Sequence, residues 1–184
     1  TYIARQAEQI ERLKELRQTI ISHAVTRGIH PYTRFRPTGI PWIPEVPEHW
    51  EVDKIRKHFK QRVEMVSDKD YPPLSVTKDG ILPQLDTAVK TLYGDKRKLV
   101  CQGDYVVNSR SDRKGSCGIS PFDGSVSLIN MVMSSMDGEQ GYYHLLFRSN
   151  DFIEEFYRNG HGIVADLWTT RYQEMKNIEI PFPP

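Results

Sequence analysis

Three charged residues near the end of the chain have the residue types of a metal-dependent nuclease. Asp166 is followed by Glu174, and Lys176 comes two residues later. In such nucleases two carboxylates hold Mg²⁺ and a lysine helps to position the attacking water. The spacing is loose, however, and a Mg²⁺ site requires carboxylates that converge in space. A stand-alone Mg²⁺-dependent nuclease is therefore kept as an alternative hypothesis.

The rest of the sequence lacks the common catalytic and cofactor-binding motifs. It contains no Walker A loop or other glycine-rich nucleotide loop, no HExxH pair and no paired CxxC motifs. Gly115-Ser116-Cys117-Gly118 does not match the G-x-S-x-G nucleophile turn, and no histidine is placed to activate Cys117. The six histidines are scattered, which argues against a metal site. We expect a non-catalytic chain that binds no cofactor of its own.

Basic residues gather in three short polar segments: 27–36, 96–98 and 110–114. Loops that mix arginine, lysine, asparagine and serine can contact phosphates and base edges together. A solvated surface is the competing explanation, since surface charge is normal. We predict that the third segment contacts DNA, with phosphate contacts from the other two. The predicted residues are Asn108, Arg110, Ser111, Arg113 and Lys114, followed by Lys96, Arg97, Lys98, Arg34 and Arg36.

Composition limits the kind of protein that can carry these residues. The 184 residues have a formal net charge of +1, so a nucleic acid would have to be held by local patches. The hydrophobic content of 38% suffices for a core, and no run of about 18 apolar residues predicts a membrane span. Cys101 and Cys117 form no metal or disulfide framework, so we expect free thiols in a cytoplasmic protein. Because Thr1 is not an initiator methionine, we expect a fragment.

The first 28 residues predict one long amphipathic helix. Apolar residues recur at heptad spacing, and Gly28 stands where a glycine cap ends a helix. Such a long stripe suggests pairing with another helix, for example in a homodimer of the fragment. Packing on the chain's own domain would use the same periodicity. The predicted pairing residues are Ile3, Ile10, Leu13, Leu16, Ile20 and Ile21.

Residues 29–47 predict a proline-rich linker. Pro37, Pro41, Pro44 and Pro47 fall within eleven residues, and proline fixes φ and removes a hydrogen-bond donor. Neither a helix nor a central strand is expected here. Trp42 and Trp50 are expected to attach the linker to the body.

The remaining residues, 48–184, alternate short strand and helix patterns, which predicts the α+β class. A strand followed by a short helix is expected over 50–66. The strand 105–107 and the strand 125–133 are expected to enclose the polar loop 108–116, which is a typical place for recognition groups. Further expected elements are a strand over 71–76, a basic turn over 94–98, a helix over 152–158 capped by Ser149-Asn150-Asp151, and a closing strand over 177–180.

Three stretches, in this order, resemble a known family. They are IERLKELRQTIISHAVTRG at 10–28, IPEVPEHWEV at 43–52, and GDYVVN at 103–108 with GISPFDGSVS at 118–127. An echo of the third, KNIEIPFPP, stands at 176–184. The sequence is similar to the specificity subunit of type I restriction–modification systems.

The resemblance implies a non-catalytic protein that reads one half of a split target in double-stranded DNA. It implies a spacer helix at 1–28, a linker at 29–47 and a β-helix-like mixed-β target-recognition domain at 48–184. The implied partners are the methyltransferase (M) and restriction (R) subunits, which would use S-adenosylmethionine, ATP and Mg²⁺. The resemblance does not indicate which residues read bases. An interaction module that acts through its helix alone remains a further alternative.

Overall fold

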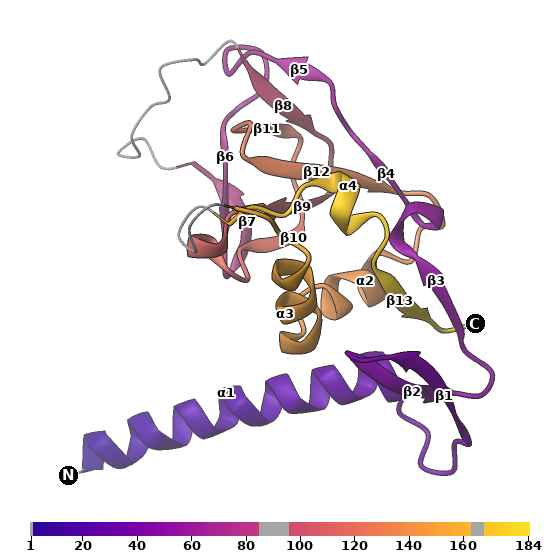
Figure 1. Cartoon of the computed structure of the whole chain (residues 1–184). Helices are drawn as coiled ribbons and strands as arrows, with labels where there is room; N and C mark the ends of the chain where they lie inside the picture. The colour runs from indigo at the N-terminus through magenta and orange to yellow at the C-terminus, as the bar shows by residue number, and fades with distance from the viewer. Residues whose placement is uncertain (1, 85–95, 163–167) are drawn as a thin grey trace.

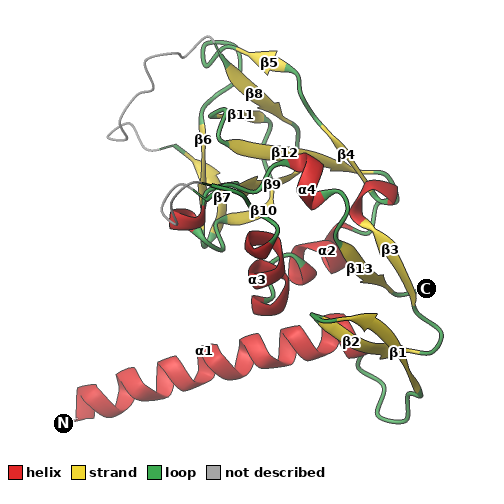
Figure 2. Ribbon diagram, in the orientation of Figure 1, coloured by secondary structure: helices red, strands yellow, loops and turns green. Residues whose placement is uncertain are grey.

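The computed structural model describes residues 2–84, 96–162 and 168–184. A long helix and a β-hairpin lie on one side of a body made of short strands and short helices (Figure 1). Figure 2 shows that strands dominate the part of the body farthest from the long helix, whereas α2 and α3 lie between the strands and that helix.

The long helix α1 spans Tyr2–Arg27, as predicted. Gly28 ends it with a positive φ of 76°, and its N–H donates to the backbone oxygen of Ala24 at 3.0 Å. Only the last turns pack on the body, where Val25 is 3% exposed and Ile21 contacts the core. The N-terminal part of α1 extends beyond the body (Figure 1).

The segment predicted as a proline-rich linker without a helix or a central strand contains a β-hairpin. Strand β1 spans Phe35–Ile40 and pairs antiparallel with β2, Ile43–Pro47. Within the described part of the chain each strand pairs only with the other, so each has an outer edge without strand-to-strand hydrogen bonds. Proline, which lacks the N–H donor, is tolerated in such edge strands. Trp42 attaches the hairpin by donating from Nε1 to the oxygen of Glu179 at 3.2 Å. Trp50 packs edge-on against Tyr142, as expected.

The body consists of short antiparallel strands. The largest sheet has the order β10-β9-β12-β4, a second has the order β11-β8-β5, and β13-β3 and β6-β7 form pairs. Bounds are β3 Glu51–Lys54, β4 Phe59–Gln61, β5 Met65–Val66, β6 Leu74–Thr77, β7 Gly80–Pro83, β8 Arg97–Val100, β9 Tyr105–Asn108, β10 Cys117–Ile119, β11 Gly124–Val126, β12 Asn130–Ser135 and β13 Glu179–Phe182.

Several expected boundaries were wrong. The helix expected within 50–66 is a single 3-10 turn, η1 (Ile55–Lys57), followed by β4 and β5, and Val63 of the supposed helical stripe is 66% exposed. The expected strand 125–133 is two strands, β11 and β12, separated by a turn. The expected turn 94–98 already contains the start of β8.

Short helices cover the largest sheet with an aromatic core. They are α2 Gln140–Leu146, α3 Asn150–Arg158 and α4 Tyr172–Met175. The Oγ of Ser149 accepts from the N–H of Phe152, so the predicted cap and helix are confirmed in α3. Phe147 of the α2–α3 junction packs against Tyr105 of β9, with ring centroids 4.6 Å apart. The α+β class and the long N-terminal helix are therefore confirmed.

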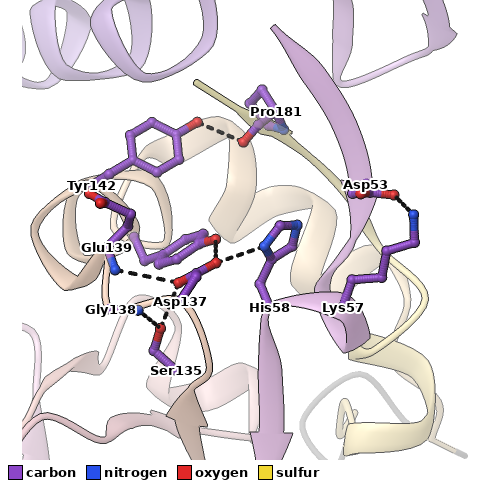
Figure 3. Close-up of polar contacts among 10 residues, drawn as sticks. Asp53, Lys57, His58, Ser135, Asp137, Gly138, Glu139, Tyr142 and Pro181 are labelled. Carbon is purple, nitrogen blue, oxygen red and sulfur yellow. Dashed lines mark hydrogen bonds and ion pairs between the residues drawn. The ribbon is translucent and has the colours of Figure 1, made fainter. Parts of the chain in front are cut away.

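A polar cluster joins the β12–α2 connection to the start of β4 (Figure 3). Asp137 Oδ2 lies 2.8 Å from His58 Nδ1 and 2.7 Å from the hydroxyl of Tyr143, and Ser135 donates to Oδ1 at 2.8 Å. Burial opposes ionisation of Asp137, but the hydrogen bonds from Tyr143, Ser135 and His58 outweigh it and lower the pKa of Asp137. The cluster therefore stabilises the ionised carboxylate.

Candidate nucleic-acid interface

The predicted polar loop lies between β9 and β10 and comprises residues 109–116, which we call the cationic loop. It contains the 3-10 turn η2, Ser111–Arg113. Its backbone is held by the segment 168–170: the N–H of Ser111 donates to the oxygen of Trp168 at 3.0 Å, and the N–H of Thr170 donates to the oxygen of Ser109 at 3.0 Å. The loop is therefore partly anchored rather than free.

Carboxylates accompany the three cations of the cationic loop. Arg110 Nε lies 3.0 Å from Asp112 Oδ1, and Arg113 Nε lies 3.9 Å from Asp112 Oδ2. Lys114 Nζ lies 2.7 Å from both carboxylate oxygens of Glu154. Because exposed ion pairs of this kind contribute about 0–1 kcal/mol, a phosphate could compete with these carboxylates.

Asn108 has a local role that the sequence did not indicate. Its Oδ1 accepts from the N–H of Arg110 at 3.1 Å, which shapes the start of the cationic loop. Reading adenine requires both the amide oxygen and the amide nitrogen of asparagine. The amide oxygen has a second lone pair, so Asn108 stays a base-edge candidate together with Arg110, Ser111 and Arg113.

The predicted phosphate contacts at 96–98 are mostly wrong. Arg97 is 4% exposed, and its guanidinium donates from Nε to Ser125 Oγ at 2.9 Å and from Nη2 to the Ser125 oxygen at 3.1 Å. Burial lowers the pKa values of Arg97 and Lys98, and Lys98 donates to the oxygen of Asn130 at 2.6 Å. Both residues sit on β8, where Arg97 is buried against Ser125 of β11 and Lys98 is half-buried. Only Lys96 is exposed.

The two hairpin arginines lie apart from the cationic loop. Arg34 is exposed and lines a shallow hollow with His30 and His49, whereas Arg36 is half-buried and donates to the Trp50 oxygen at 2.8 Å. The hairpin and β8 lie at opposite ends of the molecule (Figure 1). The three basic segments therefore do not form one continuous surface.

A groove beside Lys114 contains two cations that were not predicted. It has a volume of about 410 Å³, and Lys78 of the β6–β7 turn and Arg148 of the α2–α3 junction line it with Lys114. No sequence signal relates position 78 to position 148. The Arg148 Nη1 donates to the oxygen of Cys117 at 3.0 Å, which fixes this guanidinium beside β10.

The residues of the nuclease alternative are not brought together in the described part of the chain. Asp166 lies outside the described residues. The Oε2 of Glu174 accepts from the N–H of Arg171 at 2.9 Å and so caps the start of α4. Among residues 2–84, 96–162 and 168–184, no group of three or more histidine, cysteine, aspartate or glutamate side chains is placed to hold a metal ion. Lys176 is half-buried beside this cap.

The apolar stripe of α1 is largely exposed. Ile3 is 79% exposed and Leu13 is 64% exposed, and Ile10, Leu16 and Ile20 are also open to solvent. Ile21 differs, because it packs against the core of the body. Ile21 is only partly buried there, so its role in helix pairing stays a prediction, and the other five residues form an uncovered face. No helix in the described part of the chain is long and apolar enough to cross a membrane.

Comparison with known proteins gave matches only among solved structures. No protein-family model matches the chain, and no curated protein matches it. The HsdS subunit from Thermoanaerobacter tengcongensis matches with a TM-score of 0.53 and 13% identity, over 99% of this chain and 44% of that chain. The chain has the fold of the matched part of that HsdS subunit. The family resemblance seen in the sequence is thereby confirmed for the fold.

Two further structures also match at the level of general shape. One comes from work on the assembly and conformational transition of the type I R-M system, with a TM-score of 0.49 and 11% identity over 99% of this chain and 45% of that chain. The other is the type I restriction–modification S subunit from M. genitalium, with a TM-score of 0.44 and 17% identity over 72% of this chain and 34% of that chain. The chain spans less than half the length of each of these proteins.

Proposed function

We propose that this chain recognises double-stranded DNA as one target-recognition module of a type I restriction–modification specificity subunit. The observation that supports this most is the shared fold, which extends over 99% of the chain to the HsdS subunit from Thermoanaerobacter tengcongensis. A long helix followed by a body of short antiparallel strands is common to the whole match. The module would read one half of a split target.

The cationic loop is the part of the body best suited to the DNA contact. A rigid sheet presents it, since β9 pairs with both β10 and β12. Arg110 and Arg113 share the single carboxylate of Asp112, so the loop keeps a net positive charge. Arginine side chains at such a position can reach a phosphate or the acceptor edge of guanine.

The proposed module is non-catalytic and acts through partners. The methyltransferase and restriction subunits would supply S-adenosylmethionine, ATP and Mg²⁺ chemistry, and this chain would bind none of these cofactors. The exposed face of α1 supports a helical partner, which is either a second helix of a longer subunit or a second copy of this chain. An uncovered apolar face of this length is unusual on a monomer.

Duplex selection and a salt series test the DNA proposal. The purified chain is incubated with a pool of random duplexes, and the bound fraction is sequenced after several rounds. We expect one short motif, corresponding to a half-site. For the selected duplex, the logarithm of the binding constant should fall linearly with the logarithm of salt concentration, with a slope of about −0.9 per phosphate contact.

The opposite results would favour the alternative of a protein-interaction module that acts through its helix alone. An unenriched pool together with binding that does not respond to salt would contradict DNA recognition. If the same preparation still associates through α1, the exposed face of Ile10 and Leu13 would be its functional surface.

A further inference from the structure

The groove beside the cationic loop is built from five separate parts of the chain, one of which is α3 with Glu154. Lys78 comes from the β6–β7 turn, Lys114 from the cationic loop, Arg148 from the α2–α3 junction, and Gln18 from α1. Gln18 is itself fixed, because its Nε2 donates to the backbone oxygen of Arg148 at 2.7 Å. The groove is therefore a product of the tertiary structure and has defined walls.

Arg148 supplies a fixed positive charge to this groove. Its Nη1 donates to the oxygen of Cys117 at 3.0 Å and its Nη2 donates to the oxygen of Lys78, so two elements hold the guanidinium in place. Both acceptors are neutral, and no carboxylate among the described residues forms an ion pair with Arg148. Burial and the charge of Arg148 together lower the pKa of the neighbouring His144. A guanidinium has five N–H donors, so Arg148 keeps donors for a ligand.

Acidic groups do not balance the three cations of the groove. Glu154 is the carboxylate that lines the groove, and it binds Lys114 Nζ through both oxygens at 2.7 Å. The Lys114 and Glu154 side chains are 42% and 63% exposed, which makes this pair weak and exchangeable. Lys78 is exposed and forms no ion pair within the described part of the chain. The groove thus has a net charge that favours an additional anion.

We propose that this groove binds a phosphate of the DNA backbone, held by Lys78, Lys114 and Arg148, with Glu154 competing for Lys114. The proposal rests on the proposed DNA function and adds a site to it. A phosphate has several oxygens that can accept from cations on different sides. The groove also adjoins the cationic loop through Lys114, so a duplex on that loop would bring its backbone to the groove. A phosphate contact positions the duplex but reads no base.

Lys78→Ala and Glu154→Gln test the proposal on the whole chain. Lys69→Ala is the matched control, because Lys69 is also an exposed lysine in a turn but follows β5 and does not line the groove. Binding to the selected duplex and to a scrambled duplex is measured across a salt series. We expect Lys78→Ala to weaken both by about three- to tenfold and to reduce the salt slope by about one. Glu154→Gln should strengthen both, and Lys69→Ala should change neither beyond twofold.

Each contrary result has a distinct meaning. If the wild-type chain binds the duplex and Lys78→Ala has the same affinity as Lys69→Ala, the groove proposal is overturned and the DNA function is left intact. A wild-type chain that binds no duplex would overturn both proposals. If Lys78→Ala spares DNA binding but weakens self-association in sedimentation, the groove binds a protein carboxylate and the phosphate assignment is wrong. Unchanged melting temperatures of the two exposed-lysine variants exclude unfolding as the cause.

Discussion

The hydroxyl oxygen of Tyr142 lies 2.9 Å from the backbone oxygen of Val25, in the last turn of α1. It also lies 2.8 Å from the backbone oxygen of Pro181 in β13 (Figure 3). The last carbonyls of a helix have no partner within the helix, so Tyr142 satisfies a group that would otherwise need water. One side chain of α2 thereby joins the long helix to the strand that ends the body.

Tyr142→Phe should destabilise the junction between α1 and the body. The variant removes the hydroxyl while keeping the ring that packs on Trp50, so the loss should be about 0.5–1.5 kcal/mol. Chemical denaturation measures this free energy. Tyr32→Phe is the control, since Tyr32 is 97% exposed. Equal stability of the two variants would show that the Tyr142 hydroxyl does not contribute.

Ile10→Asp combined with Leu13→Asp should abolish self-association through α1. Burying each such apolar side chain stabilises a complex by roughly 1.5–3 kcal/mol, and several together exceed an association cost on the order of 4–15 kcal/mol. A twofold antiparallel pair would use the same face on both copies. Sedimentation over a concentration series measures the change.

The matched control for this experiment places the same charges on the polar side of α1. Ala4→Asp with Thr19→Asp should leave the dimer intact, because both positions lie off the apolar stripe at 3.6 residues per turn. A wild-type chain that is monomeric at tens of micromolar would contradict the self-association prediction.

Arg97→Ala should reduce stability rather than act on DNA directly. The variant leaves Ser125 without the buried donors from Nε and Nη2, and losing hydrogen bonds to a charged group costs about 1.5–3 kcal/mol. Thermal unfolding should show the loss. Lys96→Ala, one residue away and exposed, should leave the melting temperature unchanged. A stable Arg97→Ala variant with weakened DNA binding would mean that the buried arginine is released on binding.

Asp137→Asn should remove a contribution to stability that depends on pH. The pKa of Asp137 is lowered in the folded chain from its ordinary value of 3.8. The ionised carboxylate therefore stabilises the fold at pH values above 3.8, and this contribution is lost as the pH falls through the folded-state pKa. Urea unfolding at pH 7 should show a deficit of about 1–3 kcal/mol for the variant, and the deficit should shrink below pH 4.

Asp70→Asn provides the reference for that series, because Asp70 is an exposed carboxylate in the turn before β6. A deficit of Asp137→Asn that stays constant from pH 7 to pH 3 would show that it comes from the lost acceptor oxygen rather than from the charge, because asparagine has nearly the same shape as aspartate.

Local patterns in the sequence determined the elements whose causes are local. The helix α1 was predicted at its observed bounds because its periodicity and the Gly28 cap lie within the helix itself. The helix α3, which Ser149 caps, was predicted two residues short at its start, and the polar loop between strands was also readable. Short strands behaved differently. The spacing of Val52, Ile55 and Phe59 fits a helix, but Val52 pairs with β13 and Phe59 pairs with β12, and these distant pairings were more favourable than the local preference.

The candidate site was determined only in part by the sequence. The presence of a basic loop near position 110 was readable, because charge and turn residues are local properties. The inward direction of Arg97 depends on the pairing of β8 with β11, and the pairing of Lys114 with Glu154 depends on how α3 packs. Lys78 and Arg148 are seventy residues apart in sequence and meet only because the β6–β7 turn lies against the α2–α3 junction. Contacts of that range follow from core packing, which tertiary structure alone decides.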